Sequence, residues 1–177
     1  DKELNINKNL RKHINNKMKE KVDNYNRNPF FDEVLGHASD KLAGVEELGS
    51  FVTDAYRAYG NYDISFQNSG GIRIPYIDQG DITRGLIFKL DPFGNGLVKL
   101  EMSLEEIKSL LINSFRRNEI DLRVSGIHYT YKVSNGELID VIITDYQGNP
   151  LSKERNYKVS MNDYILNTYK FDHKDKG

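Results

Sequence analysis

The spacing of apolar residues changes near residue 28, and this change constrains the fold more than any other feature. Before it, apolar side chains recur every four residues among lysines, arginines and asparagines: Ile6, Leu10, Ile14, Met18 and Val22. Such spacing predicts one narrow apolar stripe on a helix of about five turns. The segment 24–29 is expected to end that helix. We therefore predict a connector or packing helix over 1–28, with a partner-binding helix as the alternative, and one domain over 29–177.

After residue 29 the pattern mixes helices with strands. Helices are predicted over 46–59, over a short stretch capped by Asp81 or Thr83 and ended by Pro92, and after a near capping box at Ser103 and Glu106. Strands are predicted over 34–38, 63–67, 97–102, 126–133, 138–144 and 157–161. Asn135-Gly136 is a strong signal for a two-residue hairpin turn. These elements predict a single α+β domain preceded by a helix.

Composition excludes several classes of function. With 177 residues the chain is long enough for one ordinary domain, and its net charge of −1 creates no general attraction to nucleic acid or to anionic membranes. No stretch approaches the roughly 20 apolar residues that span a bilayer. The absence of cysteine excludes disulfides, thiolate nucleophiles and cysteine-bound zinc. Asp1 begins no signal-peptide pattern, so we expect a processed or trimmed chain.

Patterns for hydrolytic chemistry are missing from the sequence. A dinuclear metal site needs several Asp, His and Asn ligands, because two cations must be held about 3.5–4 Å apart. None of the four histidines stands in a D-x-H, G-N-H-D or paired-histidine pattern: His13, His37, His128 and His173. A G-x-S-x-G nucleophile turn and a G-x-x-x-x-G-K-[ST] phosphate loop are also absent. We therefore expect no catalytic residue and no metal site in this chain.

The most distinctive polar segment covers residues 68–73 and follows a predicted strand. Its adjacent glycines, Gly70 and Gly71, permit positive φ angles and a close approach of backbone to a ligand. Asn68 offers an amide donor and acceptor, and Arg73 brings a planar fork suited to carboxylate or phosphate. The residues alone leave two interpretations open, a loop that holds an anionic or polar ligand and a plain turn at the end of a strand.

A second segment, over 90–96, places Phe93 between a proline and a glycine, with Asn95 two residues later. An aromatic ring on a rigid loop can stack on a nucleobase, a contact worth about 1–3 kcal/mol in nucleic-acid complexes. The other interpretation is that Phe93 fills the edge of the core, and the residues alone slightly favour it.

Together these segments resemble the C-terminal domain of the 5′-nucleotidase family, which includes ecto-5′-nucleotidase and bacterial periplasmic UDP-sugar hydrolases. The family patterns N-x-G-G-I-R, G-x-I-T and P-F-x-N correspond to residues 68–73, 80–83 and 92–95. Segments 48–55 and 125–131 are similar to the family's L-G-N-L-x-x-D-A helix and S-G-x-x-Y-x-Y strand. The order and spacing hold from about residue 34 to residue 162. The resemblance implies a layered α+β domain with mixed sheets.

In this family a separate metallophosphoesterase domain holds two divalent metals and performs hydrolysis, while the C-terminal domain grips the nucleoside. The resemblance implies that this chain is a nucleotide- or nucleoside-binding domain of nucleotide catabolism, without a cofactor of its own and inactive without that partner domain. Phe93 and Tyr164 would form the two sides of a base-stacking clamp. The substrate-binding residues that the resemblance implies are Asn68, Gly70, Gly71, Arg73, Phe93, Asn95, Gly126 and Tyr164.

The chain departs from the family pattern at two places. The family usually has R-E-[ST] where this chain has Gly44, Val45 and Glu46, so one anion-binding arginine is absent, and Lys41 is only a loose substitute. The G-G-D-G run that follows the second aromatic is replaced by residues 168–171. These losses favour an alternative, a degenerate binding or interaction module without enzymatic function.

Kinship also suggests where the protein acts. Most members of the family work in the periplasm or outside the cell, so the resemblance implies a bacterial protein that is periplasmic, secreted or attached to the cell surface as a lipoprotein.

Overall fold

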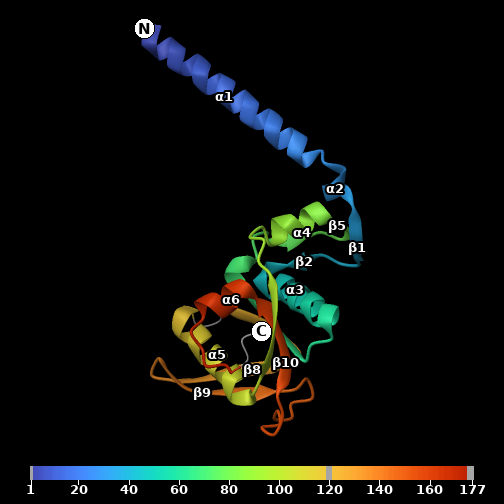
Figure 1. The fold of residues 1–177 in the computed structure, drawn as a ribbon, viewed down its shortest axis with the longest axis vertical. Helices are drawn as coiled ribbons and strands as arrows, with labels where there is room; N and C mark the ends of the chain where they lie inside the picture. Colours follow the sequence, from blue (N-terminus) through green and yellow to red (C-terminus); the bar gives the residue numbers. More distant parts are fainter. Residues whose placement is uncertain (1, 119–120, 175–177) are drawn as a thin grey trace.

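A long N-terminal helix and a folded body make up the chain. The computed structural model describes residues 2–118 and 121–174, and α1 (Lys2–Asn26) extends away from the body (Figure 1). The apolar stripe of α1 is exposed along its described length, and the side chain of Ile6 lies outside the described part. The exposed fractions are 54% for Leu10, 47% for Ile14, 61% for Met18 and 53% for Val22. The stripe therefore does not pack on this domain.

The body contains short helices and strands that alternate along the chain. Its first half comprises α2 (Pro29–Asp32), β1 (Val34–Ala38), β2 (Leu42–Ala43), α3 (Gly44–Gly60), β3 (Ile64–Asn68), the 3-10 turn η1 (Ser69–Gly71), β4 (Tyr76–Ile77), β5 (Gly80–Thr83) and α4 (Arg84–Leu90). Its second half comprises β6 (Leu97–Met102), α5 (Leu104–Asn118), β7 (Leu122–Ser125), β8 (His128–Ser134), β9 (Glu137–Thr144), β10 (Tyr157–Asn162) and α6 (Asp163–Thr168).

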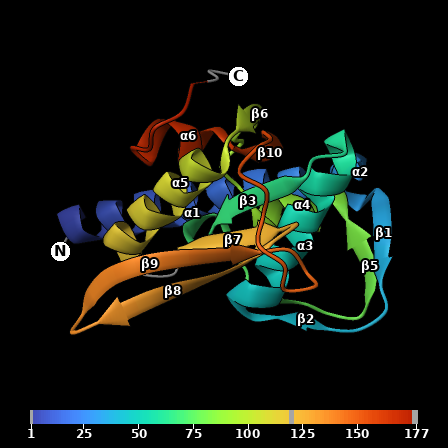
Figure 2. The ribbon, with the colours of Figure 1, turned by 90° about the horizontal axis from the view of Figure 1, so that it is seen from below.

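A mixed four-stranded sheet in the order β6-β10-β3-β7 lies at the centre of the body. β10 and β3 run parallel, while β6 and β7 pair antiparallel with them on either side. One face of the sheet forms the main core with α5 and the β8–β9 hairpin, which lie together in Figure 2. The other face packs against α3, and there the buried Ser65 and Ser160 hydroxyl oxygens are 2.6 Å apart. The result is a layered α+β domain with mixed sheets.

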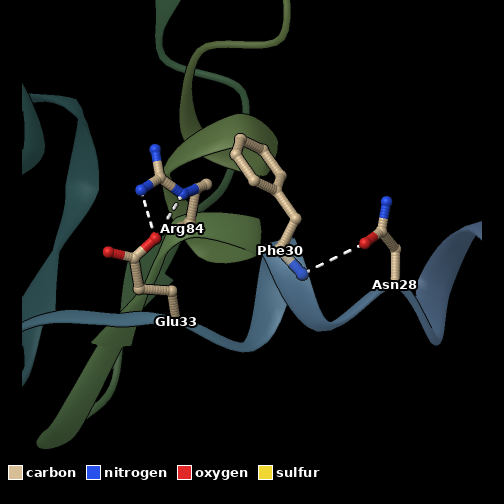
Figure 3. Close-up of polar contacts among 4 residues, drawn as sticks. All are labelled: Asn28, Phe30, Glu33 and Arg84. Carbon is tan, nitrogen blue, oxygen red and sulfur yellow. Dashed lines mark hydrogen bonds and ion pairs between the residues drawn. The ribbon is translucent and has the colours of Figure 1, made fainter.

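Short contacts join the segment that follows α1 to α4 (Figure 3). The Asn28 side chain caps α2 by accepting a hydrogen bond from the Phe30 N–H, at 3.1 Å. The Arg84 guanidinium donates to the Glu33 carboxylate, with Nε at 2.9 Å, and lies 4.4 Å from the centre of the Phe30 ring. The Arg84 N–H also donates to the Glu33 carbonyl oxygen, at 2.8 Å. α4 therefore holds the segment that follows α1.

Most predicted elements agree with the structure except at their ends, whereas α2, β2, β4, β5, β7 and α6 were not predicted. The helix predicted over 46–59 runs from Gly44 to Gly60, because Asn61 adopts the left-handed conformation that ends it. Thr83 caps α4, with its hydroxyl accepting from the Leu86 N–H at 3.2 Å. The hairpin turn has positive φ angles at both of its residues, 52° for Asn135 and 81° for Gly136. The division into 1–28 and 29–177 stays a prediction, although α1 ends two residues before that boundary.

The capping box at the start of α5 provides a test of the fold. Glu106 N–H donates to Ser103 Oγ at 3.3 Å, and Ser103 N–H donates to Glu106 Oε2 at 2.7 Å. We expect Ser103→Ala to lower the free energy of unfolding by about 1 kcal/mol, because it leaves a helical N–H without its partner. Urea denaturation measures this change. Ser50→Ala, on the exposed side of α3, is the control, and an equal loss in both variants would contradict the prediction.

Candidate functional site

The carboxyl ends of β3 and β10 lie at the same edge of the sheet because these two strands are parallel. β3 ends at Asn68 and β10 ends at Asn162, and both residues are buried. The Asn162 amide Nδ2 donates to Gln67 Oε1 and to Asn68 Oδ1, each at 2.9 Å. Its Oδ1 accepts from the Ile165 N–H at 2.9 Å and so caps α6. One asparagine thus ties the glycine segment to the start of α6.

The glycine segment folds as a compact turn that leads into Arg73. Ser69–Gly71 forms η1, and neither Gly70 nor Gly71 has a positive φ angle. An ideal Cβ at Gly71 would lie only 2.1 Å from Gln67 Nε2, so a side chain here would have to displace the end of Gln67. The Arg73 N–H donates to the Leu90 carbonyl oxygen at 2.9 Å. The Arg73 Nη1 lies 3.5 Å from the Gly70 carbonyl oxygen. The guanidinium is therefore held over the turn at the edge of the sheet.

Phe93 lies on the surface beside Arg73. Its side chain is 54% exposed, and the Arg73 guanidinium carbon is 5.6 Å from the ring centroid. The Phe93 N–H donates to Asp91 Oδ1 at 3.4 Å, which helps to shape the loop. The interpretation of Phe93 as a plug at the core edge is therefore wrong, because its ring points out of the body and meets a cation.

The same loop also contacts α6. The Asp163 N–H donates to the Gly96 carbonyl oxygen at 2.9 Å, which joins the end of the loop to the first turn of the helix. Tyr164, the next residue, is 42% exposed, and its ring packs edge-on at 6.5 Å from that of Tyr169. Asn95 is half-buried within the loop. Phe93 and Tyr164 therefore lie on two segments that a backbone hydrogen bond joins.

Two carboxylates that the sequence analysis overlooked approach this region. Burial raises the pKa of Tyr56 to about 12, and the nearby carboxylates of Asp91 and Asp163 contribute to that rise. Burial also raises the pKa of Asp91, against hydrogen bonds from the Phe93 N–H and the Gln67 amide that lower it. In the sequence, only their positions could have indicated these two residues, because Asp91 precedes Pro92 and Asp163 precedes Tyr164. These carboxylates provide hydrogen-bond acceptors next to the aromatic loop.

Gly126 lies at the opposite end of β3. In the antiparallel β3–β7 pair, Ser125 faces Ser65 while Leu122 faces Asn68. Gly126 has a φ of +100°, and an ideal Cβ there would be 2.0 Å from the Asp63 carbonyl oxygen. The contacts and the register bring five of the eight expected residues together at one edge of the sheet and leave Gly126 apart: Asn68, Gly70, Gly71, Arg73 and Phe93. Asn95 and Tyr164 lie on the two segments that the Asp163–Gly96 hydrogen bond joins.

The structure shows no cluster suited to a metal ion over residues 2–118 and 121–174, in the sense of three or more His, Asp or Glu side chains together. His37 contacts Asp81, with 3.2 Å between Nδ1 and Oδ1, on the exposed β1–β5 pair. The His128 ring packs on Tyr146 at 4.9 Å. In the same described part, no helix is both long enough and apolar enough to cross a membrane.

The family described as "5′-nucleotidase, C-terminal domain" matches residues 33–171 of the chain. The chain belongs to this family. The match covers the folded body from just after α2 to just after α6, and it includes both the glycine turn and the Phe93 loop.

Known relatives of this 5′-nucleotidase C-terminal domain are much longer proteins. Endonuclease YhcR of Bacillus subtilis is 29% identical over 145 residues, which cover 77% of this chain and 12% of that protein. Cell wall protein Lmo0130 of Listeria monocytogenes is 32% identical over 141 residues, which cover 68% of this chain and 17% of that protein. The 5′-nucleotidase precursor of Thermus thermophilus superposes with a TM-score of 0.62 at 27% identity, over 84% of this chain and 34% of that one.

Gly126 yields a stability prediction for this domain. We expect Gly126→Ala to lower the free energy of unfolding by about 2 kcal/mol or more, because the new Cβ would meet the Asp63 carbonyl in addition to the strain of a positive φ. Gly136→Ala is the matched control, since its φ is +81° but no atom lies within 4 Å of the added Cβ. Chemical denaturation compares the two, and equal losses would contradict the clash at Asp63.

Proposed function

We propose that this domain binds a nucleotide or nucleoside and acts with a separate metallophosphoesterase domain, which carries two divalent metals, in nucleotide catabolism. The observation that carries the proposal is the exposed Phe93 ring beside the Arg73 guanidinium, at the edge where two parallel strands end. Open α/β sheets usually bind ligands at the carboxyl ends of their strands.

Each chemical part of a nucleotide has a suitable group on this surface. The Phe93 ring, with Tyr164 on the bonded segment, suits the flat face of a base. The Arg73 guanidinium suits a phosphate, which it can bind through two parallel hydrogen bonds. Asp91 and Asp163 suit sugar hydroxyl groups, which donate to carboxylate oxygens. The proposal places the ligand on these residues and leaves Gly126 in a structural role.

The printed names of the relatives support a role beside a catalytic domain. They include an endonuclease and a 5′-nucleotidase precursor, and this chain spans 12% and 34% of their lengths. We propose that hydrolysis belongs to another domain, because the described residues form no metal cluster and the sequence contains neither the dinuclear-metal patterns nor the G-x-S-x-G turn.

A second candidate is a non-enzymatic binding or interaction module on the same fold. The observation that favours it is the pair of departures in sequence, Gly44-Val45-Glu46 in place of an arginine segment and residues 168–171 in place of G-G-D-G. The name of the Listeria relative, a cell wall protein, also agrees with a role in attachment. For either candidate we propose export to the periplasm, the cell surface or the medium.

Ligand titration tests the proposed surface. We expect adenosine, AMP or UDP-glucose to bind the purified chain with heat measurable by calorimetry, and Phe93→Ala to weaken binding about tenfold, because about 1–3 kcal/mol of stacking is lost. Arg73→Ala is expected to weaken the binding of AMP more than the binding of adenosine, because only AMP carries a phosphate.

Tyr59→Ala is the matched control, since this aromatic on α3 is 84% exposed and lies outside the proposed surface. No binding by the parent chain up to millimolar ligand would contradict a domain that binds alone. Equal binding by all three variants would show that the surface is placed wrongly.

A second measurement tests whether this chain by itself hydrolyses nucleotides. We expect the purified chain to release no phosphate from 5′-nucleotides, with or without added Mg²⁺, Mn²⁺ or Zn²⁺, because its residues supply no pair of metal sites. A colorimetric phosphate assay over several hours measures this. Metal-dependent release that co-purifies with the chain and disappears in Arg73→Ala would contradict the prediction.

A further inference from the structure

A second arginine reaches the glycine turn from β7. Arg123 lies directly across from Gln67 in the β3–β7 pair, so both side chains leave the same face of the sheet. The Arg123 Nε donates to Ser69 Oγ at 3.2 Å, and Nη1 lies 3.4 Å from Glu46 Oε1. Ser69 is the first residue of η1 and is next to Gly70, whose carbonyl contacts Arg73. The guanidinium groups of Arg73, in the loop after η1, and of Arg123, in β7, therefore contact neighbouring residues of one turn.

The course of the Arg123 side chain depends on a glycine in α3. An ideal Cβ at Gly49 would lie 2.4 Å from Arg123 Cγ and 2.8 Å from its Cβ, so the arginine stem passes directly over this residue. The stem is thereby confined, and the side chain is only 16% exposed. Ser69 is held in turn, because its hydroxyl donates to the Asp121 carbonyl oxygen at 2.7 Å. Both partners of the Arg123–Ser69 contact are therefore positioned before any ligand arrives.

Two carboxylates lie near Arg123: Asp121, where the guanidinium acts against the burial that raises the pKa of that carboxyl, and Glu46, which is much less confined than Arg123. Glu46 lies in the first turn of α3, and its side chain is 71% exposed. An ion pair with one exposed partner contributes little to stability, about 0–1 kcal/mol, so its replacement costs little. A phosphate, with more negative charge and three acceptor oxygens, is a stronger partner for a guanidinium than a single solvated carboxylate.

Contacts link these groups in a definite order. The Phe93 ring is 5.6 Å from the Arg73 guanidinium carbon, Arg73 contacts Gly70, and Arg123 contacts the adjacent Ser69. A nucleotide has the same order, because the base is at one end and each further phosphate lies farther from it. Arg73 is thus the nearer cation to the aromatic ring, and Arg123 is the farther one.

We propose that Arg123 is a second anion-binding side chain of the nucleotide surface, and that a phosphate group of the ligand displaces Glu46 from it. This inference rests on the proposed function and specifies it further. The domain prefers nucleotides to nucleosides, and it prefers a nucleoside diphosphate to a monophosphate, because the second phosphate extends toward Arg123. Glu46 competes with the ligand and sets the strength of that preference.

Calorimetry with adenosine, AMP and ADP tests the proposal on the whole chain. We expect Arg123→Gln to weaken the binding of ADP about tenfold, because one charge-assisted hydrogen bond to phosphate is lost. The same variant should weaken the binding of AMP less and leave the binding of adenosine unchanged. We expect Glu46→Gln to tighten ADP severalfold without changing adenosine. Glu105→Gln is the matched control, since it makes the same change in net charge on an exposed glutamate in the first turn of α5.

Arg123→Gln removes part of a confined side chain and could unfold the chain. Glu46→Gln tests the same site with the arginine in place. Thermal melts of all variants accompany the titrations. Equal weakening of adenosine and ADP in a folded Arg123→Gln variant would overturn the proposal and show a structural role only. An identical effect of Glu46→Gln and Glu105→Gln on ADP binding would overturn it as well.

Inorganic pyrophosphate separates this inference from the proposed function. We expect pyrophosphate to shift the Nε–Hε signal of Arg123 in an NMR spectrum of the ¹⁵N-labelled chain, with the signal assigned by its absence in Arg123→Lys. If the parent chain binds no adenosine but this shift occurs, the proposed binding of a base at Phe93 is wrong and the anion-binding role of Arg123 is supported. If adenosine binds and the Arg123 signal does not move, the proposed function stands and the second anion-binding role is wrong.

Discussion

The parallel pairing of β3 with β10 is the constraint on which the rest of the structure depends. It brings Asn68 and Asn162, which are 94 positions apart in the sequence, to one edge of the sheet, where the Asn162 amide bonds both Gln67 and Asn68. A buried amide with unmet hydrogen bonds costs about 1–3 kcal/mol, so this contact also fixes the register of the two strands. The glycine turn follows one of these strands and α6 follows the other, so both depend on this pair.

Close approaches of backbone explain why glycines occur where they do. Gly71 leaves room for the Gln67 amide, and Gly49 leaves room for the stem of Arg123. In both places a methyl group would displace the polar side chain that lies over the glycine. Gly71 and Gly49 therefore shape this region through the volume that they leave open, since neither has a positive φ angle.

α4 connects the segment after α2 to the candidate site. Its first residue, Arg84, binds Glu33, which directly follows α2, and the carbonyl of its last residue, Leu90, accepts a hydrogen bond from the Arg73 N–H. The Phe93 loop begins directly afterward. One short helix thus bonds the segment after α2 at one end and the glycine segment at the other.

The sequence by itself determined the family and the longer elements, but not the short strands β2, β4, β5 and β7 or the helices α2 and α6. Apolar spacing, the Ser103–Glu106 capping box and the Asn135-Gly136 turn are local signals, and the structure confirms all three. The site was predictable only in part, because its residues come from segments whose neighbours depend on strand pairing. Tertiary structure alone decided that Phe93 is exposed, that Gly126 lies at the far end of β3, and that Arg123 reaches Ser69. The reason is physical: local patterns set backbone conformation, whereas register between distant strands sets which side chains meet.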